Sequence, residues 1–268
     1  MGERSFDDLI DEALAAPMTG WDFSFLRGRS ATTPLPWDYG SVVADLADGQ
    51  PLLDLGTGGG EVLAALPARP GRTVAAEGWA PNVPVAGRRL RPLGIPVIHY
   101  LSAPENPGQD LAAGPATAGL PDRLPFRDAT FGLVLSRHES FRASEVARVL
   151  APGGHFITQQ VDLHDSDDYR AALGLAADPA PDESWLAAAR QQVRAAGLAE
   201  IRAERAVQQA SYSDIGALAW YLLQAVPWIV PEGLAGCRPA LHRLHEQMRE
   251  APFTARAYRF LLVAQKPG

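Results

Sequence analysis

The sequence contains a single cysteine, Cys237, among its 268 residues, so one chain can form neither a disulfide bond nor a cysteine zinc site. It contains no run of the roughly 20 apolar residues that a membrane-spanning helix needs. The first residues, MGERSFDDLIDEALAAP, are acidic and amphipathic, unlike a signal peptide. An excess of basic residues is also missing, since the net charge is -7, which argues against broad nonspecific binding of nucleic acid. We therefore expect a cytoplasmic protein without membrane segments.

Strand-like and helix-like stretches alternate along the chain, which is long enough for one large α/β domain with an appended cap. The apolar runs predict strands at residues 51–54, 72–77, 96–101, 130–136, 154–161, 198–207 and 257–266. Amphipathic spacing predicts helices at residues 5–16, 36–47, 60–66, 82–93, 143–150, 182–196 and 238–249. Residues 27–36 are too rich in small and turn residues to predict a regular element. Alternation of this kind predicts a mostly parallel, Rossmann-like sheet with helices on both faces.

The most informative stretch is Pro51–Leu63, PLLDLGTGGGEVL, which predicts a buried strand, a glycine turn and a helix. Glycine tolerates positive φ and lets a ligand approach the backbone closely. The stretch resembles motif I of the class I S-adenosylmethionine (SAM)-dependent methyltransferases. A dinucleotide-binding Rossmann unit is the runner-up, although Glu61 stands at its third glycine position and Asp54 would repel a pyrophosphate. A glycine-rich turn that binds nothing is the third possibility.

The resemblance implies that SAM is held along this turn and at the end of the next strand. Asp54 would bind its amino group, and backbone at Gly56, Thr57, Gly58 and Gly60 would line its methionyl and ribose portion. The alternative is that Asp54 shapes the turn by capping nearby backbone N–H groups. Glu77, followed by Gly78 and Trp79, would accept both ribose hydroxyls, although dinucleotide enzymes also place an acid there.

A second match covers Gly119–His138, GLPDRLPFRDATFGLVLSRH, which resembles a motif of small-molecule methyltransferases. Two positions depart from it. The adenine-binding Asp-Ala of the family falls on Leu120 and Pro121, so we expect looser adenine binding or help from Asp122. The acidic residue of the following strand falls on Gly132. Residues 146–161, VARVLAPGGHFITQQV, resemble the family's next turn and strand.

Residues 136–141, SRHESF, follow a strand at the place where the cofactor's methyl group is expected, and Ser136 is assigned to the cofactor site. His138 is the candidate general base, because its ordinary pKa is near 6.5, and Glu139 would orient it or bind a cationic substrate. The alternative is that His138 packs under the cofactor and Glu139 caps the next helix.

Four parts are expected: an N-terminal helical arm (residues 1–48), a SAM-binding core (49–207), a helical insert (208–253) and a last core strand (254–268). We assign Trp37 and Tyr39 of the arm, with Trp220 and Tyr221 of the insert, to acceptor binding. Alternatively, the aromatic residues of the arm only anchor it to the sheet. The alternative for the insert is a lateral extension of the core or a dimer face instead of a cap over the acceptor.

The sequence thus predicts a SAM-dependent methyltransferase with a small-molecule acceptor, without a metal site, and with an oligomeric state that the sequence does not indicate. His242, His245 and Glu246 share a helix face, but no third group completes a metal site. Two alternatives stay open. One is an rRNA or tRNA methyltransferase, and the other is a protein of this fold in which SAM binding or methyl transfer is weakened or lost.

Overall fold

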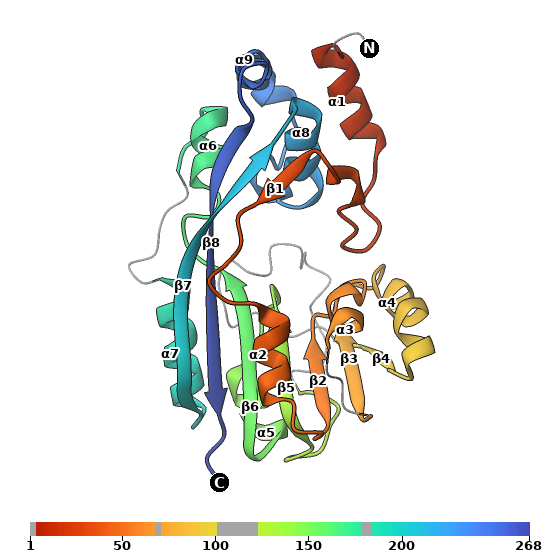
Figure 1. The fold of residues 1–268 in the computed structure, drawn as a ribbon, viewed down its shortest axis with the longest axis vertical. Coiled ribbons are helices and arrows are strands. Elements are labelled where there is room, and N and C mark those ends of the chain that lie inside the picture. The colour runs from red at the N-terminus through yellow and green to blue at the C-terminus, as the bar shows by residue number, and fades with distance from the viewer. Residues whose placement is uncertain (1–3, 68–70, 101–122, 178–183) are drawn as a thin grey trace. The chain divides into compact units, whose positions relative to one another are not determined.

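The computed structural model describes residues 4–67, 71–100, 123–177 and 184–268 (Figure 1). The chain divides into two compact units. The sheet unit comprises Pro36–Asp162, Asp182–Ala206 and Arg259–Gly268, and the helical unit comprises Met1–Leu35, Leu163–Pro181 and Val207–Tyr258. The expected N-terminal arm is therefore shared between the two units, since residues 1–35 belong to the helical unit and residues 36–48 to the sheet unit.

Within the described residues, eight strands form one sheet in the order β1-β7-β8-β6-β5-β2-β3-β4. Their bounds are β1 Ser30–Thr32, β2 Leu52–Leu55, β3 Thr73–Glu77, β4 Val97–His99, β5 Phe131–Arg137, β6 Leu150–Val161, β7 Ala199–Tyr212 and β8 Phe253–Gln265. The neighbours from β4 to β6 are parallel, whereas β8 is antiparallel to β6 and β1 is antiparallel to β7. The predicted mostly parallel, Rossmann-like sheet is confirmed.

Strand β2 lies between β3 on one side and β5 on the other, so the strand order reverses there. In open α/β sheets, ligands bind outside the carboxyl ends of the strands at such a reversal. All four residues of β2 are buried, as a parallel strand covered on both faces requires. The glycine turn that follows β2 therefore lies at the crevice that the topology favours.

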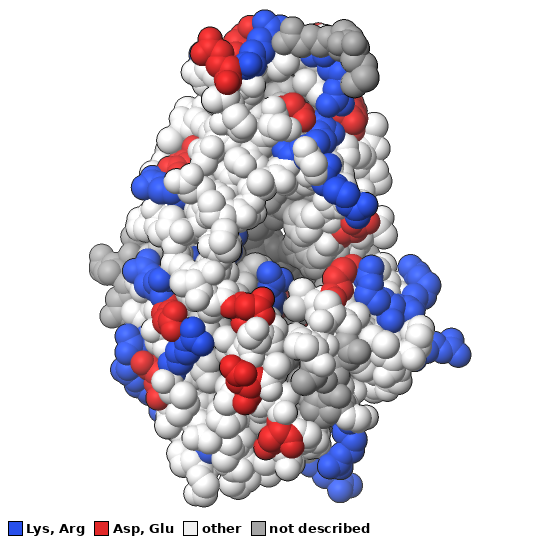
Figure 2. Space-filling view, in the orientation of Figure 1, with Lys and Arg blue, Asp and Glu red and all other residues white. Residues whose placement is uncertain are grey.

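Helices of the sheet unit are α2 Tyr39–Leu46, α3 Glu61–Ala65, α4 Val83–Leu90, α5 Ala143–Val149 and α7 Trp185–Ala195. Two of them begin at side chains that accept a backbone N–H, Asp38 for α2 and Ser184 for α7. Short 3-10 turns occur at Arg91–Leu93 in this unit and at Ser24–Leu26, Pro227–Ile229 and Ala235–Cys237 in the helical unit. A group of basic side chains marks the region of α4 and its 3-10 turn (Figure 2).

Arg148 on α5 holds the segment that resembles the small-molecule methyltransferase motif. Its guanidinium donates to the carbonyls of Leu124 and Phe126 and pairs with Asp128 and Glu145. Glu145 in turn accepts the backbone N–H of Leu124 at 2.7 Å. One arginine therefore fixes the entry to β5 by bonds to backbone and side chains, which gives this part of the motif a structural role.

The helical unit is built from α1 Phe6–Ala15, α6 Asp167–Leu173, α8 Ile215–Gln224 and α9 Arg238–Met248, together with β1 and parts of β7 and β8. Helix α1 begins with a capping box in which Ser5 and Asp8 satisfy each other's backbone N–H groups. Its buried face, Phe6, Leu9, Ile10 and Ala13, has the helical spacing that the sequence predicts. In the described part of the chain, no helix combines the length and apolar character that a membrane span requires.

Two expectations about this unit need correction. Residues 30–32 form strand β1, although the region was expected to be irregular, because their backbone pairs with residues 210–212 of β7. For the same reason β7 continues to Tyr212 instead of ending at Val207. The expected helical insert therefore begins with strand, and its helices are α8 and α9.

Candidate functional site

The glycine turn between β2 and α3 has the conformation that its sequence predicts. Gly56, Gly58 and Gly60 have φ values of 67°, 61° and 82°, which favour glycine. Thr57 donates its backbone N–H to the carbonyl of Ala76 on β3, at 3.0 Å, so the turn is bonded to the neighbouring strand. A Cβ on Gly60 would lie 2.9 Å from Cγ of Leu90, so close packing on α4 also requires glycine there.

Glu77 ends β3 and turns its carboxylate toward the glycine turn. Its Oε2 accepts the backbone N–H of Gly58 at 2.6 Å, and its Oε1 accepts that of Trp79 at 2.8 Å. The residue is only 3% exposed, and burial raises the pKa of its carboxyl although both backbone bonds oppose the shift. The carboxylate is thus fixed in position and retains lone pairs for a ligand's hydroxyl groups.

Gly78 and Trp79 continue from Glu77. The carbonyl of Gly78 lies 3.0 Å from Nε2 of His99 on β4. The Trp79 side chain is 45% exposed, so it offers an aromatic surface that the fold of the sheet unit does not use. The adenine residues expected from the sequence, Leu120, Pro121 and Asp122, lie outside the described residues.

Asp54 is buried and lies one residue before the end of β2, the strand next to that of Glu77. The pKa of its carboxyl is raised to about 7, chiefly by burial and further by the negative charge of Glu77, while the Thr57 side chain and the positive charge of Arg137 oppose the shift. Near neutral pH, Asp54 is therefore only partly ionised. A cationic ligand beside it would stabilise the ionised form.

Glu139 reaches back to the glycine turn. A Cβ built on Gly56 would collide with Cβ and Cγ of Glu139 and lie 2.8 Å from its Oε2. The Glu139 side chain therefore covers the first glycine of the turn, and a ligand on that backbone must share this space with it. The carbonyl of Glu139 accepts bonds from Ser136 Oγ at 2.8 Å and Gln160 Nε2 at 2.7 Å, so the Ser136 hydroxyl braces the turn after β5.

His138 follows β5 with φ of 56°, a left-handed conformation that is uncommon for a residue other than glycine. Conformations of this kind cost about 1–3 kcal/mol and cluster at functional sites. His138 as a whole residue is exposed, yet loss of water around its imidazole and the nearby positive charges of Arg137 and Arg259 hold the pKa of that imidazole well below the usual range. His138 is therefore neutral at pH 7.

Gln159 on β6 links His138 to Trp37. The indole Nε1–H of Trp37 donates to Gln159 Oε1 at 2.8 Å, which directs the amide nitrogen of Gln159 toward the imidazole. That nitrogen lies 3.5 Å from His138 Nε2. This arrangement favours an imidazole that keeps its proton on Nδ1 and accepts at Nε2.

Trp37 and Tyr39, the predicted acceptor residues of the arm, lie at the start of α2, which packs against β6. Trp37 is 6% and Tyr39 9% exposed. The Tyr39 hydroxyl is buried and has no hydrogen-bond partner among the described residues. It is close enough to Asp54 and Arg137 for both charges to affect its pKa, which burial raises above the usual value.

Trp220 and Tyr221, the predicted acceptor residues of the insert, belong to the core of the helical unit. Trp220 is 1% exposed, donates its indole N–H to the carbonyl of Ala16 at 2.7 Å and stacks on Phe25. Tyr221 packs against Tyr169 and Tyr212. In this conformation Trp220 offers no surface to a ligand, because the apolar spacing of α8 buries it.

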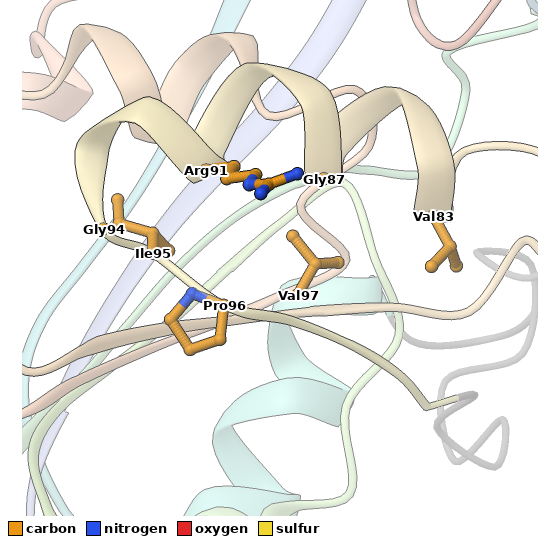
Figure 3. Close-up of a pocket in the computed structure, with 7 residues that line it drawn as sticks. All are labelled: Val83, Gly87, Arg91, Gly94, Ile95, Pro96 and Val97. Atoms are coloured by element: carbon orange, nitrogen blue, oxygen red, sulfur yellow. The ribbon is translucent and has the colours of Figure 1, made fainter.

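A pocket of about 440 Å³ lies beside α4 (Figure 3). It is lined by α4, its 3-10 turn and the start of β4, with Val83, Arg91 and Val97 among its residues. None of the predicted site residues contributes to it. Among the described residues, no group of His, Cys, Asp and Glu side chains has the arrangement of a metal site.

Sequence reasoning missed Arg137 and Gln159. No role was predicted for Arg137. The parallel register pairs Asp54 with Leu135, so Arg137 lies two residues further along β5 and on the same face of the sheet as Asp54. A charged residue at the carboxyl end of a buried strand was the available signal. Gln159 gave no signal, because its role depends on a bond to Trp37, which is 122 positions away.

Comparison with known proteins supports the resemblance that the glycine motif predicts. Residues 53–158 match the family model described as methyltransferase domain. No curated protein matches the sequence.

Three solved structures share the fold, each at 17% identity. A candidate methyltransferase of Bacillus halodurans C-125 has a TM-score of 0.53, with 85% of this chain and 97% of that chain covered. The YcgJ protein of Bacillus subtilis has a TM-score of 0.51 with the same coverage, 85% and 97%. A functionally unknown protein from Deinococcus radiodurans R1 has a TM-score of 0.51, with 88% and 91% covered.

Proposed function

We propose that this chain, whose residues 53–158 match the methyltransferase domain family model, transfers a methyl group from SAM to a small-molecule acceptor. One observation supports the cofactor most directly. Two buried carboxylates, Asp54 and Glu77, lie near the carboxyl ends of neighbouring parallel strands beside the glycine turn, and burial raises the pKa of both. Such a pair favours a ligand that brings hydroxyl donors and a positive charge.

The residues present fit the cofactor. Glu77 would accept the ribose hydroxyls with the lone pairs that its backbone bonds leave, and Asp54 would hold the amino group. The backbone of Gly56–Gly60 and the carbonyl of Gly78 would lie along the ligand. When bound, SAM supplies an electrophilic methyl group on a positively charged sulfur. We further propose that Leu120, Pro121 and Asp122 contact adenine.

Glu139 lies on the cofactor side of the site, because its side chain covers Gly56. Ser136 would act indirectly, by bracing the turn that carries Glu139. This arrangement favours a role for Glu139 in positioning the cofactor or the turn more than direct proton transfer. Its carboxylate would also add negative charge beside a cationic ligand.

His138 would take the acceptor's proton. It is neutral at pH 7, and it would accept the proton at Nε2 after releasing the long, 3.5 Å contact with the amide nitrogen of Gln159. A base with a lowered pKa accepts a proton weakly, so we expect positioning of acceptor and methyl group to provide most of the rate enhancement. Well-oriented reactants gain roughly 7–11 kcal/mol in this way.

Transfer of radiolabel tests the proposed reaction. The protein is incubated with methyl-labelled SAM and a total extract of the source organism, and label is counted in the small-molecule, RNA and protein fractions. We expect label in the small-molecule fraction with the natural protein and its loss with Glu77→Ala, but not with the control Glu200→Ala, an acid that pairs with Arg190 away from the turn. Label in RNA would favour the nucleic-acid alternative. Binding of SAM without any transfer would favour the non-transferring one.

A further inference from the structure

A row of polar side chains crosses one face of the sheet near the carboxyl ends of β2, β5 and β6. We call Asp54, Arg137, Gln159 and Arg259 the polar row. The register pairs Asp54 with Leu135, Arg137 with Gln159, and Val161 with Arg259. Because paired residues and residues two apart share a face of a sheet, all four side chains project from the same side.

The polar row contains two arginines, Arg137 and Arg259, and one acid, Asp54. Burial lowers the pKa of Arg137, and the nearby positive charge of Arg259 lowers it further. The acid nearest to Arg137, Asp54, is only partly ionised near neutral pH. Among the described residues, the Arg137 guanidinium has no ion pair within 4.0 Å and no hydrogen bond. Partly buried positive charge of this kind favours an anionic ligand.

Tyr39 adds a second, independent observation. Its hydroxyl is buried without a hydrogen-bond partner in the described part of the chain, and it lies near Arg137 and Asp54. A buried hydroxyl left unpaired costs about 1–3 kcal/mol, so native proteins usually pair such groups with protein, water or ligand. A hydroxyl donor beside a guanidinium is a combination that suits a carboxylate, which accepts from both.

We propose that Tyr39, Arg137 and Arg259 form a binding site for a carboxylate, and that the carboxylate belongs to the acceptor. This assignment rests on the proposed function. The cofactor groups are expected at β2 and β3, whereas Arg259 lies on β8, which is three strands from β2 in the sheet. At a spacing of about 4.8 Å between strands, that separation is roughly 14 Å. The row thus extends from the cofactor side toward a second ligand, and the acceptor would be an organic acid.

Calorimetric titration with benzoate at low salt tests this site, with the neutral isostere benzamide as the ligand control. We expect saturable binding of benzoate and none of benzamide. Arg137→Gln should weaken benzoate binding roughly tenfold to a hundredfold, the loss of a charge-assisted bond. The control Arg88→Gln, an exposed arginine of α4, removes the same charge and should leave benzoate binding unchanged. Equal binding of benzoate and benzamide, or no binding of benzoate, would overturn the proposal.

Tyr39→Phe separates ligand binding from folding. Because the hydroxyl has no partner among the described residues, its removal should leave the urea midpoint unchanged or higher while benzoate binding weakens several-fold. Unchanged benzoate binding in Tyr39→Phe would remove Tyr39 from the site.

A third experiment identifies the molecule to which the carboxylate belongs. Benzoate is titrated into protein saturated with S-adenosylhomocysteine (SAH). If the site serves the acceptor, benzoate still binds to the SAH complex with unchanged affinity. Competition between benzoate and SAH would assign the site to the cofactor's own carboxylate and overturn the acceptor assignment. Failure of SAH to bind at all would contradict the proposed function, while the benzoate result on ligand-free protein would still test the site.

Discussion

Replacement of Asp54 by asparagine should stabilise the ligand-free protein at alkaline pH. In the folded chain the pKa of Asp54 is raised from 3.8 to about 7, chiefly by burial. The folded state therefore holds a proton at pH values where the unfolded chain has lost it, and the free energy of unfolding falls as pH rises through this window. At 1.36 kcal/mol per pKa unit, the loss reaches about 4 kcal/mol above pH 7 as an upper limit. Asparagine cannot ionise, so the Asp54→Asn variant avoids this loss.

Urea unfolding at two pH values measures the effect. At pH 4, where Asp54 is protonated in the folded protein, both proteins should unfold at nearly the same urea concentration. At pH 8.5 the variant should be more stable, while its affinity for SAM should be lower, because the amide cannot offer a negative charge to the amino group. A stability difference that is the same at both pH values, or a variant that is less stable at pH 8.5, would refute the reasoning.

Three further predictions concern the glycine turn and the base. Gly56→Ala should destabilise the protein by more than the roughly 1–2 kcal/mol that a left-handed residue costs, because the added methyl group collides with the Glu139 side chain. Gly94→Ala, which has a similar φ and open space around it, should cost only that backbone strain. Urea midpoints of the two variants measure the difference. Trp37→Phe should cost about 1–3 kcal/mol in urea unfolding, since it leaves the buried Gln159 carbonyl unpaired. His138→Ala should lower kcat without changing SAM affinity in calorimetry; equal losses of both would show a structural role.

The sequence was sufficient to predict the sheet because its strands are short apolar runs between clear turn signals. The stretch PLLDLGTGGGEVL predicts β2, the turn and α3 in the positions where the structure has them. Strand β1 could not be predicted, because the small residues Ser30–Thr32 gain strand structure only by pairing with β7, about 180 positions away. Long-range pairing of this kind leaves no local pattern.

The candidate site was predicted where residues lie next to a motif and missed where they depend on distant partners. Glu77 ends β3 as expected, whereas β2 continues one residue past Asp54, to Leu55. The departure from the family pattern at Gly132 has a packing reason, because a Cβ there would collide with Gln50. Trp220 was assigned to a ligand surface because aromatic residues suit binding sites as well as cores, and a helix sequence does not distinguish the two. The structure places it in the core.

Calorimetric titration with SAH tests most directly whether two buried acids and a glycine turn hold a nucleoside cofactor. Natural protein should bind one equivalent, and Glu77→Ala should bind at least roughly tenfold more weakly, as expected for the loss of charge-assisted bonds to the ribose. The Glu200→Ala control should bind like the natural protein. Absence of binding at millimolar SAH, or an affinity that Glu77→Ala leaves unchanged, would contradict the account.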